Sequence, residues 1–194
     1  MITHLNGVLE EKTPASAVID VGGIGYLLSI SLHTYAQLPD KGTVRLFTHL
    51  AIREDAHVLY GFFNQDEREL FRQLISVSGV GGNTALSILS GLDPAGVKDT
   101  ITDGDVARLK SVKGVGPKTA ERIIVDLRDK VGKVEVGELG FASEQNKLRD
   151  EALTALVTLG FAKNAANKAI DKVLKKHGTD IGVEEIVKHA LSNF

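Results

Sequence analysis

Two stretches of the sequence carry one pattern thirty-five positions apart: Ser78-Gly79-Val80-Gly81-Gly82-Asn83-Thr84-Ala85 and Lys113-Gly114-Val115-Gly116-Pro117-Lys118-Thr119-Ala120. Each stretch places a Gly-Val-Gly turn between two runs of apolar residues at helical spacing. Leu70 and Leu74 precede the first turn, and Leu109 precedes the second. Both copies therefore predict a helix, a short glycine turn and a second helix.

Such a turn suits contact with a phosphate group. Glycine lacks a Cβ atom, so an anion can approach the backbone N–H groups, which here begin a new helix and lie at the positive end of its dipole. Lys113 and Lys118 flank the second turn, and Thr119 adds a hydroxyl group. The alternative is an αα-hairpin whose glycines only connect two helices. Because the same frame occurs twice, we favour backbone binding, and the pattern resembles the helix-hairpin-helix motif of non-sequence-specific DNA binders.

Composition narrows the class of protein. A chain of 194 residues is long enough for one or two ordinary domains, or three small ones. No run approaches eighteen apolar residues, and the start of the chain has no signal-peptide layout, so we expect a cytoplasmic protein without membrane contact. The absence of cysteine excludes disulfides, thiolate zinc sites and cysteine nucleophiles. The six histidines show no paired metal spacing, so we expect no metal and no cofactor.

The charge distribution points to a local basic face. The net charge is −2, so affinity for nucleic acid has to come from one region. Residues 108–133, around the second turn, contain eight basic residues against three acidic ones. A solvated helix face is the alternative explanation.

Residues 1–63 are predicted to form a small barrel of the OB-fold type. Their short apolar and β-branched segments are separated by turn residues, which is typical of strands. The expected strands are residues 2–9, 17–21, 26–32, 44–49 and 57–62. The glycines at positions 22, 23 and 25 could suggest a dinucleotide fingerprint, but no helical pattern follows them.

The last two expected strands are joined by a charged tip, Arg53-Glu54-Asp55. A solvated hairpin turn is one interpretation. The other is an acidic projection that faces DNA, where two carboxylates would repel phosphates and reject the wrong DNA shape.

The rest of the chain is predicted to be helical. Residues 64–132 form the domain with both turns, residues 133–146 look like a flexible linker, and residues 147–194 form a three-helix module. The helices expected in this module are residues 148–159, 164–174 and 183–191. Leu159-Gly160-Phe161 joins the first two, as in ubiquitin-associated-like protein-binding domains. These side chains either close the core or meet a partner, and both roles are compatible.

Together these features resemble the RuvA family of Holliday-junction-binding branch-migration subunits. The resemblance covers essentially the whole chain, and its most specific parts are residues 46–71 and 114–126. It implies a multidomain β + α fold: an N-terminal OB-fold barrel, a tandem helix-hairpin-helix domain and a C-terminal UBA-like module. It also implies a homotetramer, with one or two tetramers on a four-way DNA junction. The implied partners are a ring-shaped AAA+ ATPase motor of the RuvB type and a junction resolvase of the RuvC type.

The resemblance assigns roles to individual residues. Glu54 and Asp55 would be acidic pins near the crossover. Leu159, Gly160 and Phe161 would lie in the motor-binding module. The residues expected to contact DNA backbones are Gly79, Val80, Gly81, Gly82, Asn83, Lys113, Gly114, Val115, Gly116, Lys118, Thr119 and Arg122.

One position departs from the family pattern. Where the family usually has Pro-Lys after the first turn, this chain has Gly82-Asn83. The substitution removes a cation, so we expect the first hairpin to depend on backbone N–H groups and to bind its phosphate less strongly.

Enzymatic alternatives are less well supported. Residues 114–119 approach a phosphate loop, but Pro117 and the glycine spacing do not fit, so we expect no ATPase in this chain. A helix-hairpin-helix DNA glycosylase would need a carboxylate base, and Asp126 is the one suitable residue. A two-metal nuclease would need further carboxylates near Glu54 and Asp55. A protein scaffold that binds no DNA is the remaining alternative.

Overall fold

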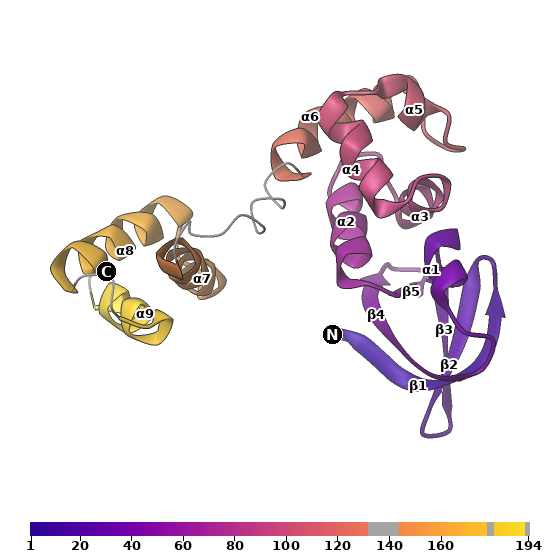
Figure 1. Ribbon diagram of the computed structural model, residues 1–194, viewed down its shortest axis with the longest axis horizontal. Helices are drawn as coiled ribbons and strands as arrows, with labels where there is room; N and C mark the ends of the chain where they lie inside the picture. The colour runs from indigo at the N-terminus through magenta and orange to yellow at the C-terminus, as the bar shows by residue number, and fades with distance from the viewer. Residues whose placement is uncertain (132–143, 178–180, 193–194) are drawn as a thin grey trace. The chain divides into compact units, whose positions relative to one another are not determined.

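The structure is a computed structural model that describes residues 1–131, 144–177 and 181–192 (Figure 1). The chain divides into two compact units, residues 1–134 and 135–194. In the described ranges, no helix is both long and apolar enough to cross a bilayer. The elements are β1 (His4–Thr13), β2 (Ser16–Val21), β3 (Ile24–Ile30), α1 (Leu32–Gln37), β4 (Gly42–Ile52), β5 (His57–Phe62), α2 (Gln65–Ile75), α3 (Gly82–Gly91), α4 (Pro94–Asp103), α5 (Val106–Lys110), α6 (Pro117–Val131), α7 (Glu144–Thr158), α8 (Lys163–His177) and α9 (Val183–Leu191).

The five strands close into a barrel in the order β1-β2-β3-β5-β4. β1 pairs antiparallel with both β2 and β4, and a short parallel pairing between β3 and β5 closes the ring. Alternate residues face inward, so that Ile19, Leu28 and Leu46 are fully buried in the barrel core. The OB-fold expectation is confirmed.

The third strand is shorter than predicted. It ends at Ile30, and the residues that follow form the short helix α1, which the sequence analysis did not predict. The Ser31 side chain accepts a hydrogen bond from the Thr34 backbone N–H at 3.0 Å, an N-cap that ends the extended conformation and begins the helix. The expectation of a strand through Leu32 is therefore wrong.

A buried carboxylate ties α1 to α2. Glu67 is fully buried, and its two oxygens accept hydrogen bonds from the Ser31 and Thr34 hydroxyls. The Thr34 hydroxyl oxygen also accepts from the Phe63 N–H at 3.0 Å. Glu67 thus fastens the barrel to the helices.

Helices α2 to α6 pack beside the barrel and share a core with it (Figure 1). Tyr60 and Phe62 of β5 belong to the same buried cluster as Phe71, Leu89 and Ile123 of the helices. The ends of the connecting helices are also fixed by side chains: the Asp93 and Asp105 carboxylates accept the backbone N–H groups of Gly96 and Arg108. The barrel and the paired turns are consequently held in one packed body, residues 1–134.

The second unit is a small bundle of α7, α8 and α9. Its core includes Leu156, Ile170 and Ile186, all fully buried. A salt bridge between Arg149 and Asp171 at 2.8 Å joins α7 to α8. Most of the linker expected over residues 133–146 lies outside the described residues, but its last three positions belong to α7, which begins at Glu144.

Candidate nucleic-acid interface

The two glycine turns have matching backbone hydrogen bonds. In the first, Val77 N–H donates to the Leu74 carbonyl, and Val80 N–H donates to the Val77 carbonyl. Thirty-five residues later, the same bonds run from Val112 to Leu109 and from Val115 to Val112. Gly79 and Gly114 have φ of 90° and 91°, a left-handed conformation that favours glycine. The repeat in sequence is thus a repeat in backbone geometry.

Each turn presents the start of a helix to solvent. Gly81 is the N-cap of α3, and no side chain caps the first N–H groups of this helix. Gly116 takes the equivalent place before α6, where its carbonyl accepts from Ala120 N–H as that of Gly81 does from Ala85. A Cβ added to either glycine would meet nothing within 4 Å. An anion therefore has open access to both helix starts.

The side chains of the two central valines point the other way. Val80 and Val115 are 6% and 7% exposed and belong to the core of the helices. Of the expected DNA-binding residues, these two can reach a phosphate only through their backbone atoms. Their side chains hold the two turns in place.

The second turn carries its own positive charge. Lys113, Lys118 and Pro117 are exposed, and Thr119 is half-buried at the start of α6. Arg122, one turn later, donates a hydrogen bond from its guanidinium to the Ser78 carbonyl at 3.1 Å. The structure thus brings this arginine of the second helix pair onto the first turn, where it links the two hairpins.

The first turn differs at the two positions where the sequence departs from the family. Asn83 is exposed and neutral, whereas Gly82 is buried against the barrel. A Cβ on Gly82 would lie 2.2 Å from the hydroxyl oxygen of Tyr60. A side chain at position 82 would have to displace Tyr60 in this chain, a constraint that the sequence does not reveal.

Tyr60 belongs to an aromatic cluster beneath the first turn. Its ring lies 4.8 Å from that of Phe71 and 6.5 Å from that of His49. Burial lowers the pKa of His49, and the nearby Arg72 and Arg68 guanidinium groups lower this pKa further. The first hairpin therefore lies against barrel residues that sequence reasoning did not assign to the site.

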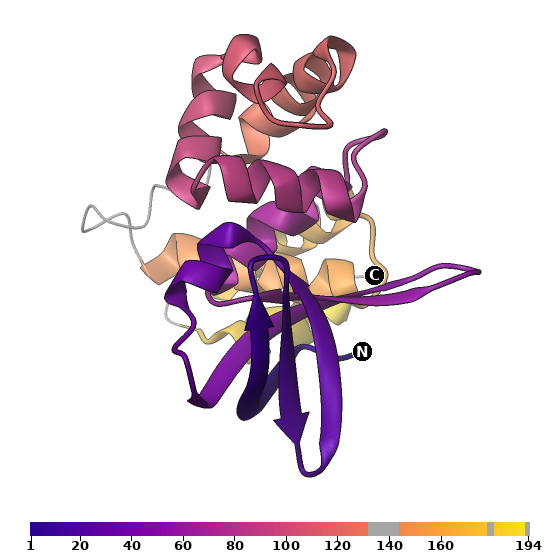
Figure 2. The ribbon, with the colours of Figure 1, turned by 90° about the vertical axis from the view of Figure 1, so that its right-hand side faces the viewer.

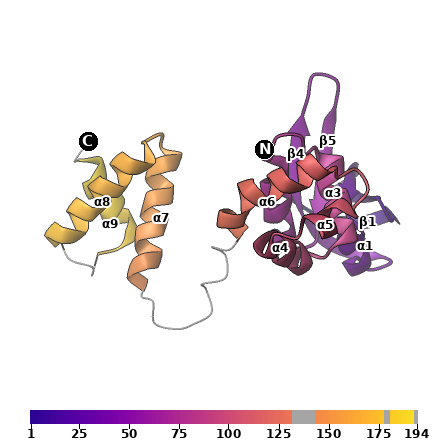
Figure 3. The same cartoon turned by 90° about the horizontal axis from the view of Figure 1, so that it is seen from above.

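The acidic tip projects away from the barrel on the β4–β5 hairpin (Figures 2 and 3). Ile52 and His57 form the last strand pair, and Arg53 N–H donates to the Ala56 carbonyl at 2.9 Å to close the turn. Glu54 and Asp55 are exposed at its end. Among the residues that the structure describes, neither carboxylate forms a salt bridge.

The expected partner-binding residues of the second unit divide into two kinds. Leu159 is 60% exposed, whereas Phe161 is half-buried and packs against the bundle core. Gly160 between them has φ of 98°, which makes the sharp bend between α7 and α8. Phe161 packs against the core, and Leu159 is left as an exposed apolar side chain at the end of α7.

Asp126, the residue that a glycosylase would use, is exposed on α6. Its neighbour Val125 is 77% exposed, while Leu127 is fully buried. Within the described ranges, no group of three or more His, Cys, Asp or Glu side chains is arranged to hold a metal ion.

Three family models match successive parts of the chain. The model of the RuvA N terminal domain matches residues 1–61, that of the SAM-like helix-hairpin-helix tandem matches residues 71–129, and that of the RuvA C-terminal domain matches residues 147–193. The matched ranges correspond to the barrel, the paired hairpins and the three-helix bundle.

Curated relatives match over nearly the full length. A protein of Christiangramia forsetii is 50% identical over 98% of both chains, and one of Flavobacterium psychrophilum is 47% identical over 100% of both. A third, from Syntrophotalea carbinolica, is 46% identical over 98% of both chains. Each of these relatives is named Holliday junction branch migration complex subunit RuvA.

Proposed function

The chain belongs to the RuvA family of Holliday junction branch migration complex subunits, and from this premise we propose that it binds four-way DNA junctions through backbone phosphates. The observation that supports this proposal most strongly is the pair of glycine turns with one hydrogen-bond pattern on a single packed body. Two open helix starts hold two phosphates without reading a base.

The acidic tip gives this binding its preference for junctions. Glu54 and Asp55 lie at the end of an extended hairpin, with no cation paired to them among the described residues. At a crossover the strands separate and leave room for the tip, whereas a continuous duplex would press its phosphates against two carboxylates. The tip thus disfavours ordinary duplex and guides the strands apart.

The chain acts without catalysis of its own. Four copies assemble on the junction, either as one tetramer or as two, in the cytoplasm. The three-helix bundle recruits a ring-shaped ATPase motor of the RuvB type through the surface that contains Leu159, and a RuvC-type resolvase then cuts the junction. The motor supplies the work of branch migration in recombination and repair, and this chain orients the motor on the junction.

The proposal is tested by measuring binding of the purified protein to a four-way junction and to linear duplex with the same arm sequences, across a range of salt concentrations. We expect a clear preference for the junction and an affinity that falls steeply as salt rises. Equal affinity for both DNAs would contradict junction specificity, and an affinity that does not depend on salt would contradict phosphate binding.

The role of the tip is tested separately with the double variant Glu54→Gln/Asp55→Asn. We expect this variant to bind linear duplex more tightly than the wild type does, with a smaller preference for the junction. The matched control is Glu10→Gln/Glu11→Gln, which removes the same charge from two adjacent exposed residues of β1. If both variants gain duplex affinity equally, the effect is one of net charge and the tip has no special role.

A further inference from the structure

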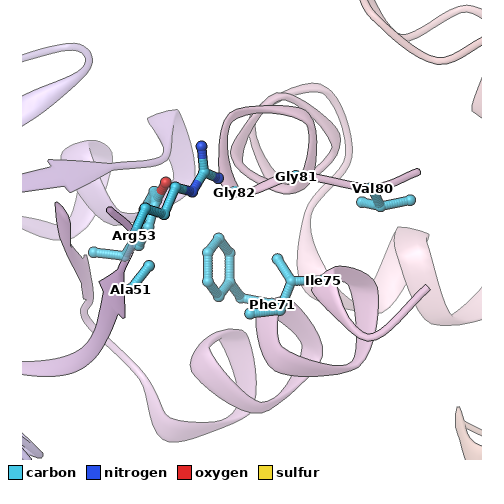
Figure 4. A pocket seen from close by; sticks show the side chains of 8 residues that line it. Ala51, Arg53, Phe71, Ile75, Val80, Gly81 and Gly82 are labelled. Atoms are coloured by element: carbon cyan, nitrogen blue, oxygen red, sulfur yellow. The ribbon is translucent and has the colours of Figure 1, made fainter. Parts of the chain in front are cut away.

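A small cavity lies where the base of the β4–β5 hairpin meets the first glycine turn. It has a volume of about 150 Å³ and is lined by Ala51, Arg53, Tyr60, Phe71, Val80 and Gly82, among others (Figure 4). The apolar side chains form its inner wall. Its polar side chains are Arg53 and Tyr60, and Gly81 and Gly82 at the start of α3 also line it.

The Tyr60 hydroxyl points at the start of α3 without a partner. Tyr60 is 3% exposed, and in the described part of the chain its hydroxyl makes no hydrogen bond. A Cβ added to Gly82 would lie 2.2 Å from the Tyr60 hydroxyl oxygen. The hydroxyl therefore faces the first turn of α3. The hydroxyl lines the cavity and is accessible from it, so it can donate a hydrogen bond to a ligand that enters there.

Arg53 adds a positive charge to the same place. Its guanidinium lies beside Gly82 in Figure 4, and it forms no salt bridge within the described ranges. The start of a helix is the positive end of its dipole. The Arg53 guanidinium and the start of α3 therefore repel each other, and an anion between them would relieve this repulsion. A guanidinium, a hydroxyl and helix N–H groups converge here, and all of them are donors.

We propose that this cavity binds one phosphate of the DNA backbone, with Arg53 and Tyr60 as its side-chain ligands. The inference rests on the proposed function and adds two residues to it. Arg53 supplies the cation that Asn83 does not, and the Tyr60 hydroxyl donates to a phosphate oxygen. Because Arg53 is adjacent to Glu54, the same phosphate fixes the acidic tip relative to the DNA arm held by the first hairpin.

The test compares junction affinity across salt for Arg53→Gln, Tyr60→Phe and the wild type. Arg53→Gln should raise the Kd and reduce the slope of log Kd against log salt by about 0.9 for each subunit engaged, because one phosphate contact is lost. Tyr60→Phe should raise the Kd about fivefold and leave the slope almost unchanged, because a neutral hydrogen bond is lost. Adding Asn83→Lys to Arg53→Gln should restore the slope.

Two control variants separate these effects from general ones. Arg45→Gln removes an exposed arginine of β4, the strand that leads to Arg53; Arg45 stacks on Phe47 at 5.2 Å and does not line the cavity. Tyr26→Phe removes the hydroxyl of a half-buried tyrosine that packs against the barrel core. Both variants should bind the junction as the wild type does.

The outcomes distinguish this inference from the function on which it rests. If the wild type prefers the junction but Arg53→Gln changes the slope no more than Arg45→Gln does, the cavity does not bind phosphate. If Tyr60→Phe binds as tightly as Tyr26→Phe, Tyr60 is not a ligand and the cavity as described is wrong. If the wild type itself shows no preference for the junction, the proposed function fails.

Discussion

The two hairpins have the same backbone but different surroundings. The second turn, with Lys113 and Lys118 beside it, stands in solvent and carries its charge in its own sequence. The first has the neutral Gly82-Asn83 and is packed against Tyr60 of the barrel. The same glycine geometry thus occurs once in a turn with its own lysines and once in a neutral turn that is packed against the barrel.

This difference shows that a motif's sequence does not report its whole binding site. The first turn has no lysine where the second has Lys113 and Lys118, so its own residues predict weaker phosphate binding. In the structure, Arg53 and the Tyr60 hydroxyl lie at its helix start, and Arg122 reaches its Ser78 carbonyl from the second hairpin. A charge absent from one segment can thus be supplied by a residue that is its neighbour only in space, and we propose that Arg53 does so for the first hairpin.

The largest effect is expected from a bulky side chain at position 82. Gly82→Leu should lower the free energy of unfolding by about 2–3 kcal/mol, because the new side chain overlaps the buried Tyr60 ring. Pro117→Leu makes the equivalent change in the second hairpin, where the position is exposed, and should cost less than about 0.5 kcal/mol. Chemical denaturation measures both. Equal costs would show that the two hairpins do not differ in their surroundings.

A smaller effect, of opposite sign in the two hairpins, is expected from charge. Lys118→Gln should weaken junction binding and reduce the salt slope by about 0.9 for each subunit engaged. Asn83→Lys should strengthen binding at moderate salt and increase the salt slope. Both increases should be smaller if Arg53 already supplies a cation at the first hairpin. Salt titration of junction affinity tests both variants. An unchanged affinity and slope for Asn83→Lys would count against a phosphate at the first hairpin.

The smallest effect concerns the aromatic cluster beneath the first hairpin. Burial and the two nearby arginines lower the pKa of His49 in the folded protein, below its value of about 6.5 in the unfolded chain. The unfolded state therefore binds a proton first as the pH falls, so His49 contributes no penalty above about pH 6.5 and destabilises the fold below it. His49→Gln should show a shallower loss of stability between pH 7 and pH 5 than the wild type. Parallel curves would show that His49 is not the titrating group.

The sequence predicted the architecture well because its signals are local. Glycine turns between runs of apolar residues at helical spacing predicted the two hairpins, which the structure shows at both places. The sequence did not predict α1, because the Ser31 cap and the buried Glu67 that stabilises it are thirty-six residues apart. The approach of Gly82 to Tyr60 and the bond from Arg122 to Ser78 were missed for the same reason. Contacts between distant segments leave no periodicity in the chain.

The most direct test of the two open helix starts uses Gly81→Asp and Gly116→Asp. Both positions are exposed with free space around them, and an aspartate at an N-cap accepts the first N–H groups of the helix. We predict that each variant keeps or slightly raises its Tm, because the new cap adds at most a few tenths of a kcal/mol to the free energy of unfolding. Each should lose tenfold or more in junction affinity, because the carboxylate occupies the phosphate position and repels DNA. A loss of about tenfold corresponds to the free energy of a charge-assisted hydrogen bond. Junction binding at wild-type strength by both stable variants would contradict the central claim that the paired hairpins hold the DNA backbone.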